Sequence, residues 1–254
     1  MRSAVCPSST KLLTPSRRYA PPAGVAVMAT PAASLRPSSS AKATGAVVPR
    51  AEMARISREL AARDIVLFCD ETYGRFVYED EFTSLAALPN WRDNGVVVST
   101  FSKSFAMAGW RVGYLLAPRH VCDAAIRIQD AMIICAPVIS QVGVEAAVRE
   151  SWDYPASFKP ELAARRQLLA EGLMDIPRLR WTPTAGGFFA FVAVEGCSDS
   201  AALATAILER AHVVTIPGST FGRAGEGFLR LSYAAVSRPD LGAALGRLRD
   251  FFNR

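Results

Sequence analysis

Short apolar runs alternate with segments of helical periodicity along the first half of the chain. Three short apolar runs predict buried strands. They are residues 65–69, 95–98 and 112–117. Apolar residues spaced three and four apart predict helices at residues 49–63 and from Pro118 onward. The apolar face of the second helix consists of Val121, Ala125, Ile128 and Met132. Strands separated by helices favour an α/β fold with a mostly parallel sheet.

The second half contains the same kinds of segment in a different order. Helical periodicity predicts helices at residues 140–149, 161–173 and 201–211, and a closing helix after Ser237-Arg238-Pro239-Asp240, which is a capping pattern. In the second of these, Leu162, Leu169 and Leu173 are expected to face inward and the arginines outward. Strands are predicted at residues 179–181, 187–194, 213–216 and 228–233. This order predicts a smaller α+β portion.

Charge is distributed unevenly along the chain. The formal net charge is +6, but residues 1–50 hold seven basic residues and no acidic one, so residues 51–254 are nearly neutral. A nucleic-acid surface on the folded part is therefore not expected. The five cysteines form no CxxC pair and the two histidines are far apart, which argues against a metal site. No apolar run approaches the length of a membrane-spanning helix.

The first 41 residues are rich in Ser, Ala, Pro and Arg and contain no acidic residue. This composition favours a disordered leader that resembles an organellar transit peptide. A plastid is favoured over a mitochondrion because no amphipathic arginine face is visible. The alternative is that translation starts at Met28 or later, which would leave the protein in the cytoplasm.

Residues that can carry chemistry gather after the second apolar run. The segment Ser99-Thr100-Phe101-Ser102-Lys103 supplies hydroxyls and an amine, and Arg111 follows before the third run. Small ligands bind at such strand ends in open α/β sheets. The lysine could carry out covalent chemistry while the arginine holds an anion. A surface loop with two solvated cations is the alternative.

A second polar group follows the first apolar run, which ends at Asp70, with Tyr73 three residues later. Asp70, Tyr73, Lys103 and Arg111 stand in the order, and close to the spacing, of the class I/II aminotransferases. The chain therefore resembles these enzymes, which are fold-type I pyridoxal-phosphate enzymes. The resemblance implies an α/β fold: the C-terminal part of a cofactor-binding large domain, with a mostly parallel sheet, followed by a smaller α+β domain.

The resemblance also implies a role for each residue. Lys103 would form an aldimine with pyridoxal 5′-phosphate and shuttle a proton, and Asp70 would pair with the pyridine nitrogen. Tyr73 would donate to the phenolic oxygen of the cofactor. The alternative for Asp70 is an ordinary strand-end aspartate that caps a turn, and the alternative for Tyr73 is a half-buried core tyrosine. The 5′-phosphate would be held by Thr100, Ser102 and Arg111. Glu71 is expected to be a solvated neighbour of Asp70, and Gly109 and Gly113 are expected to permit close backbone approach.

Arg230 lies inside the apolar segment Phe228-Leu229-Arg230-Leu231. An arginine in a buried strand requires an anion. The resemblance implies that Arg230 binds the α-carboxylate of the substrate, and an internal ion pair with Glu226 is the alternative.

The resemblance begins at Thr44 and implies three divisions: a leader at 1–41, a partial large domain at 42–135, and a small domain with connecting helices at 136–254. Lys42-Ala43-Thr44-Gly45 stands where the family has Asn-Pro-Thr-Gly, and the family's N-terminal half has no counterpart here. Two hypotheses follow. In the first, the chain is an aminotransferase that acts on an amino acid and a 2-oxoacid, and the resemblance implies a homodimer. In the second, it is an impaired fragment or paralogue that acts by binding.

Overall fold

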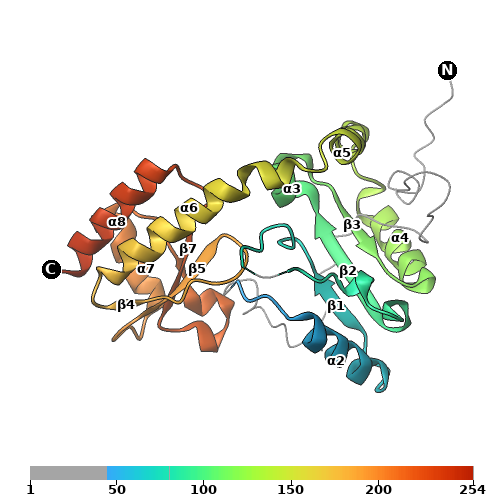
Figure 1. Cartoon of the computed structure of the whole chain (residues 1–254), viewed down its shortest axis with the longest axis horizontal. Coiled ribbons are helices and arrows are strands. Elements are labelled where there is room, and N and C mark those ends of the chain that lie inside the picture. Colours follow the sequence, from blue (N-terminus) through green and yellow to red (C-terminus); the bar gives the residue numbers. More distant parts are fainter. Residues whose placement is uncertain (1–44, 80, 254) are drawn as a thin grey trace. The chain divides into compact units, whose positions relative to one another are not determined.

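The computed structural model describes residues 45–79 and 81–253, which form two compact units (Figure 1). The described residues of the first unit are 48–75 and 81–156, and those of the second are 45–47, 76–79 and 157–253. The leader predicted over 1–41, the substituted residues Lys42 and Ala43, and Thr44 lie outside the described residues. Among the helices that are described, none combines the length and the apolar character needed to cross a membrane.

The first unit is built on a three-stranded sheet in the order β1-β2-β3. Its strands are β1 (Leu67–Asp70), β2 (Gly95–Thr100) and β3 (Gly113–Leu116). The first two are parallel, as predicted, but β3 runs antiparallel to β2. The connection between β2 and β3 holds only the short helix α3 (Phe101–Ser104) and the 3-10 turn η3 (Ala108–Trp110). It contains no helix long enough to cover the sheet, and the chain turns back along β2.

Helices cover the sheet of the first unit because β2 is apolar on both faces. Val96 packs with Leu115 and with Cys122 of α4 (Arg119–Ile133). Val97, which points to the other face, packs with Leu85 of η1 (Leu85–Ala87), with Trp91 of η2 (Trp91–Asp93) and with Met53 of α2 (Arg50–Ala61). Successive strand residues point to opposite faces, so this single strand anchors both layers.

The predicted apolar face of α4 is only half correct. Val121 and Ala125 pack against the core of the sheet, as predicted. Farther along the helix, Ile128 is 50% exposed and Met132 is 66% exposed. The spacing of the four apolar residues predicts the helix correctly, but only the first two of them pack against the core of the sheet.

The second unit contains a four-stranded antiparallel sheet in the order β4-β5-β7-β6. The strands are β4 (Leu179–Arg180), β5 (Phe189–Val194), β6 (Ile216–Pro217) and β7 (Phe228–Ser232), and the helices are α6 (Tyr154–Met174), α7 (Ser200–Ala211) and α8 (Arg238–Phe252). Its α+β character agrees with the prediction. In β5 and β7, residues 190, 192, 229 and 231 are buried, whereas residues 189, 191, 228 and 230 lie on the more open face.

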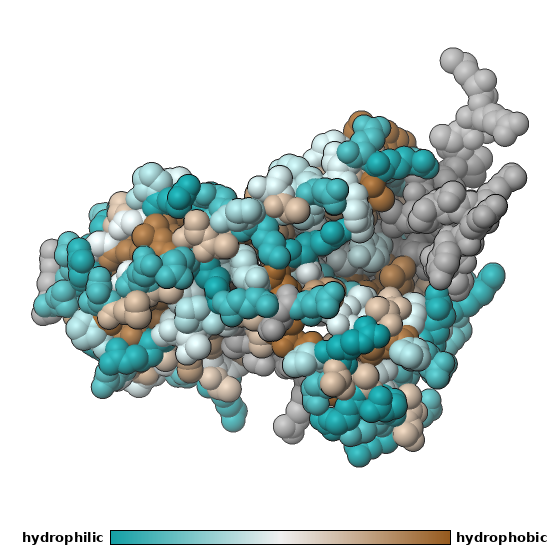
Figure 2. Space-filling model, in the orientation of Figure 1, coloured by the Kyte–Doolittle hydropathy of each residue, from teal (hydrophilic) through white to brown (hydrophobic). Residues whose placement is uncertain are grey.

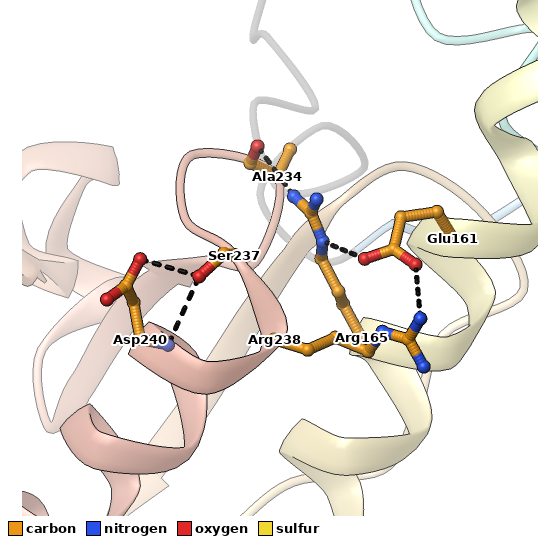
Figure 3. Close-up of polar contacts among 6 residues, drawn as sticks. All are labelled: Glu161, Arg165, Ala234, Ser237, Arg238 and Asp240. Atoms are coloured by element: carbon orange, nitrogen blue, oxygen red, sulfur yellow. Dashed lines mark hydrogen bonds and ion pairs between the residues drawn. The ribbon is translucent and has the colours of Figure 1, made fainter.

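A polar cluster links α6 to the start of α8 (Figure 3). Glu161 accepts a hydrogen bond from Nε of Arg165 at 2.9 Å and forms an ion pair with Arg238 at 3.1 Å. The Arg165 hydrogen bond, with help from Arg238, holds the pKa of Glu161 below its ordinary value. The arginines of α6 were expected to face outward, but the side chains of Arg165 and Arg166 are only 18% and 12% exposed. Both have acidic partners, which explains how they can be covered.

The two units divide at residues 156 and 157, inside α6. The resemblance predicts that the large domain ends at residue 135 and that the connecting helices belong to the small domain. In the structure, helix α5 (Val138–Glu150) and the first residues of α6 belong to the first unit.

Candidate active site

Asp70 is the last residue of β1, where it lies opposite Val98 of the parallel strand β2. Its side chain is exposed, and Oδ1 accepts hydrogen bonds from the backbone N–H of Thr72 at 3.1 Å and from the Thr72 hydroxyl at 2.5 Å. These bonds turn the chain immediately after the strand, as Asp and Thr side chains commonly do. Tyr73 follows in the same turn and is half-buried.

Thr100 ends β2 and fixes the segment that follows. Its Oγ1 accepts the N–H of Ser102 at 3.1 Å, donates to the carbonyl of Val112 at 2.9 Å, and lies 2.8 Å from the Ser102 hydroxyl. A hydroxyl has one proton to donate. Since the Thr100 proton is directed at Val112, Ser102 supplies the proton between the two hydroxyls. Thr100 thus orients Ser102 and ties the start of α3 to the start of β3.

Lys103 and Arg111 lie near the start and the end of the connection between β2 and β3. Lys103 is in α3 and half-buried, and its ammonium has no hydrogen bond or ion pair to any residue that the structure describes. Arg111 has a φ of 55°, in the left-handed region that non-glycine residues seldom adopt, and its Nη1 donates to the carbonyl of Ala108 at 2.9 Å. Such strained residues concentrate at functional sites.

Close backbone approach within the protein is found at one of the two glycines. A Cβ on Gly113 would lie 2.6 Å from the carbonyl oxygen of Ser99 on the neighbouring strand. A Cβ on Gly109 would meet no protein atom within 4 Å, so the close approach expected there stays a prediction about the bound ligand.

One edge of the sheet therefore brings together five of the predicted site residues. The parallel strands β1 and β2 both end there, and the antiparallel β3 begins there, since Thr100 pairs with Gly113. The residues at this edge are Asp70, Thr100, Ser102, Lys103 and Arg111, and Tyr73 follows in the turn after β1. A carboxylate, hydroxyls, an amine and a guanidinium at one strand edge can bind an ionic ligand and exchange protons with it.

Glu71 differs from its expected role as a solvated carboxylate. It is half-buried, and its Oε1 accepts the backbone N–H of Leu85 at 2.8 Å. Burial raises its pKa, although hydrogen bonds from Leu85 and Ser84 oppose the shift. Burial also raises the pKa of Cys69 to about 11. Glu71 therefore belongs to the inner side of this edge and holds the following loop in place.

Arg230 belongs to the second unit. It lies in the middle of β7, where it pairs with Phe191 on one side and with Ile216 on the other. Its guanidinium carbon lies 4.4 Å from the ring centroid of Phe189 and 4.9 Å from that of Phe221. Within the described residues, the guanidinium has no ion pair.

The alternative of an ion pair between Arg230 and Glu226 is not found. Oε1 of Glu226 instead accepts the backbone N–H groups of Ser200 at 2.6 Å and Gly227 at 3.1 Å. The Ser200 amide is the main cause of a lowered pKa at Glu226. The carboxylate nearest in sequence to Arg230 is thus used to hold the start of α7.

Some residues of these sites were missed by the sequence analysis. Thr72 could have been found, because a threonine two residues after an aspartate at a strand end is a known turn pattern. The contact of Phe221 with Arg230 could not, because it is formed only when η4 (Gly218–Phe221) packs beside β7.

Comparison with known proteins places these residues in a family context. Residues 39–248 match the family model described as "Aminotransferase class I and II". The chain is 37% identical over 213 residues to a valine–pyruvate aminotransferase of Mycobacterium tuberculosis, covering 83% of this chain and 54% of that protein. It is 33% identical over 211 residues to an aspartate aminotransferase of Pyrococcus horikoshii, covering 81% and 53%. The chain spans about half the length of the curated relatives it matches.

Solved structures give the same picture. The crystal structure of an aromatic aminotransferase from Pyrococcus horikoshii matches with a TM-score of 0.78 at 28% identity, covering 82% of this chain and 57% of that one. The aspartate aminotransferase of Thermotoga maritima matches with a TM-score of 0.76 at 31% identity, covering 83% and 54%. The described α/β and α+β units are thus similar to the corresponding part of these enzymes.

Proposed function

Because the chain belongs to the class I and II aminotransferases, we propose that it moves an amino group between an amino acid and a 2-oxoacid with the help of pyridoxal 5′-phosphate. Members of this family depend on that cofactor. The observation that carries the proposal is the shared strand edge at which Asp70, Lys103 and Arg111 lie.

The residues at this edge fit the chemical groups of the cofactor. The Arg111 guanidinium is a donor suited to a phosphate, and the Ser102 hydroxyl becomes a second donor when its proton turns from Thr100 Oγ1 towards the ligand. Asp70 supplies a carboxylate for the ring nitrogen, and Tyr73 supplies a phenol for the ring oxygen. When bound, the cofactor provides an electron sink for a carbanion at the substrate α-carbon.

The protein residues perform the remaining steps. Lys103 takes the proton from the α-carbon of the amino acid and returns a proton during the reverse half of the exchange, a contribution of about 10²–10⁴-fold to such reactions. The Asp70 carboxylate keeps a proton on the ring nitrogen because a negative charge favours the protonated form. Arg230 binds the α-carboxylate of the substrate through its planar N–H groups.

The relatives differ in the substrates that their names state, which include aspartate, aromatic amino acids, and valine with pyruvate. We therefore propose the substrate pair only as an amino acid and a 2-oxoacid. These relatives are all named as aminotransferases, although the substrates in their names differ. The reaction type is therefore the part of the proposal that they support.

We also propose that the protein forms a homodimer. Seven large apolar side chains of the first unit are 50–70% exposed around the end of α4 and the start of α5, and Figure 2 shows part of this patch over α5. They are Ile128, Met132, Ile133, Ile134, Val138, Ile139 and Val142. Exposed patches of this kind mark interaction surfaces. We name these seven residues the α4–α5 patch and assign it to a second copy of the chain.

The compartment remains a proposal based on composition. We propose import into a plastid, directed by residues 1–41, which lie outside the described residues. A fluorescent protein fused after residue 44 should enter plastids of a plant cell, and a diffuse cytoplasmic signal would contradict this.

The proposed activity can be tested by adding pyridoxal phosphate to the purified full chain. We expect a visible absorbance band that is absent from Lys103→Ala and retained in Lys159→Ala, a lysine on α6. The loaded protein should then transfer the amino group of aspartate, valine or phenylalanine to 2-oxoglutarate or pyruvate.

Two outcomes would overturn the proposal. No spectral change at saturating cofactor would favour the alternative, that the chain acts by binding a partner. A band without exchange on the whole panel would show that the cofactor site is present but that this chain is not an aminotransferase.

A further inference from the structure

The guanidinium of Arg230 lies over two aromatic rings. Two rings, Phe189 from β5 and Phe221 from η4, lie 4.4 and 4.9 Å from the guanidinium carbon. Both distances are within the range of about 6 Å in which a cation is attracted to an aromatic face. The rings come from different segments of the second unit, so the contact depends on how that unit folds.

The N–H donors of this guanidinium form no hydrogen bond or ion pair with any residue that the structure describes. A guanidinium carries five such donors, and its contact with an aromatic ring does not consume them. Arg230 has no carboxylate partner among the described residues, and Glu226 is engaged by the amides of Ser200 and Gly227. The two rings therefore contact the cation, and its N–H donors remain for a ligand.

Phe221 is itself held in place by its neighbours. Its ring packs edge-on against Phe191 at 5.7 Å, and Phe191 stacks on Phe228 at 4.8 Å. Phe191 also pairs directly with Arg230 across the two strands. A row of aromatic side chains on the open face of the sheet thus supports the ring that contacts the guanidinium.

We propose that Phe221 and Phe189 are positioning residues that preorganise Arg230 to bind a carboxylate in a bidentate manner. An arginine side chain has many rotamers, and fixing it before the ligand arrives removes an entropic cost from binding. The aromatic faces also replace water around the cation. This inference deepens the proposed function, on which it rests for the identity of the anion as the α-carboxylate of the substrate.

The test measures carboxylate binding directly and needs no cofactor. The full chain is labelled with ¹⁵N-arginine, and the Nε–H resonance of Arg230 is assigned by its loss in Arg230→Gln. The probe is 3-phenylpropanoate, and the uncharged 3-phenylpropanamide serves as the ligand control. The variants are Phe221→Leu, which removes the ring, Phe221→Tyr, which keeps it, and Phe251→Leu, which removes a ring that contacts Arg210 elsewhere in the unit.

We expect the propanoate, but not the amide, to shift the Arg230 resonance in the wild-type chain. Phe221→Leu should raise the dissociation constant about fivefold, the size of a partly exposed cation–π contact. Phe221→Tyr and Phe251→Leu should bind as the wild type does. Circular dichroism confirms that each variant is folded, and if Phe221→Leu unfolds, Phe189→Leu takes its place against Phe189→Tyr.

The inference is overturned if the ring-free and ring-bearing variants bind equally, or if the wild-type resonance does not respond to the carboxylate. Its failure is distinct from that of the proposed function. A chain that lacks aminotransfer activity can still show carboxylate binding that depends on the rings, and an active chain can show binding that does not.

Discussion

Asp70 and Glu71 are adjacent carboxylates with different surroundings. Asp70 is exposed and turns the chain through Thr72, whereas Glu71 is half-buried and binds the Leu85 amide. Successive residues at the end of a strand point to opposite faces. Sequence position alone identified Asp70 as the candidate but could not show that the loop at Leu85 would fold over Glu71.

Glu71 is predicted to make stability depend on pH. The unfolded chain ionises this group near its ordinary pKa of 4.5, and burial raises the pKa in the native state. The native state therefore binds more protons just above pH 4.5, and the free energy of unfolding falls as pH rises through the native pKa. In Glu71→Gln, whose amide oxygen can still accept from Leu85, this part of the decline should disappear.

Urea unfolding between pH 4.5 and 8 measures this effect. The control is Glu150→Gln, which changes an exposed carboxylate at the end of α5 and should keep the wild-type pH profile. If the free energy of unfolding of Glu71→Gln changes with pH as that of the wild type does, ionisation of Glu71 does not destabilise the native state, and the prediction is wrong.

Asp70→Asn separates the charge of Asp70 from its role in the turn. The amide oxygen can still accept both hydrogen bonds from Thr72, so the free energy of unfolding should stay within about 0.5 kcal/mol of the wild type. A neutral group cannot keep a cation on the ring nitrogen, and we expect amino transfer to fall on the order of 10²–10³-fold. Single-turnover kinetics measure the loss, and Asp130→Asn on α4 is the control. Activity within about twofold of the wild type would remove Asp70 from the site.

Most helices and strands could be predicted from the sequence because each carries its own apolar period. Helix α8 begins after Ser237 as its capping pattern predicts, with the Asp240 N–H donating to the serine hydroxyl at 3.3 Å. The direction of β3 and the exposure of Ile128 were not predictable in this way. Both depend on which segments pack against β3 and α4 in the folded chain. The spacing of apolar residues within one element does not give this information.

The cap of α8 offers a test at this scale. Ser237→Ala removes the side-chain acceptor for Asp240 and should lower the free energy of unfolding by about 1 kcal/mol. Ser237→Asn, which restores an acceptor, should recover most of the loss, and Ser198→Ala changes an exposed serine as a control. Equal unfolding curves for Ser237→Ala and Ser198→Ala would show that the cap does not stabilise the helix.

At the scale of the whole molecule, the family and the α/β and α+β character of the two units agree with the sequence analysis. The family could be predicted from four residues near strand ends, because their order and spacing together are more specific than any one of them. They are Asp70, Tyr73, Lys103 and Arg111. The sequence could not show which apolar side chains lack a cover, because the α4–α5 patch has the same helical spacing as a core face.

The proposed homodimer predicts that the α4–α5 patch is covered in solution. Light scattering after size exclusion should give the mass of two chains for the wild type. Ile139→Glu places a charge in the patch and should yield monomers, since a buried unpaired charge is strongly unfavourable. Val214→Glu changes a residue of the second unit that is 74% exposed and lies outside the patch, so it should remain dimeric. A monomeric wild type, or a dimeric Ile139→Glu, would contradict this assignment.

The most direct test of the central claim is to fix the cofactor to the protein and find where it is attached. The chain has four lysines, at positions 11, 42, 103 and 159, so the label can be assigned by peptide mass spectrometry. After incubation with pyridoxal phosphate and reduction with borohydride, we predict label on Lys103, with none on any lysine of Lys103→Arg under the same conditions. Equal labelling of all four lysines, or label that persists in Lys103→Arg, would contradict the account.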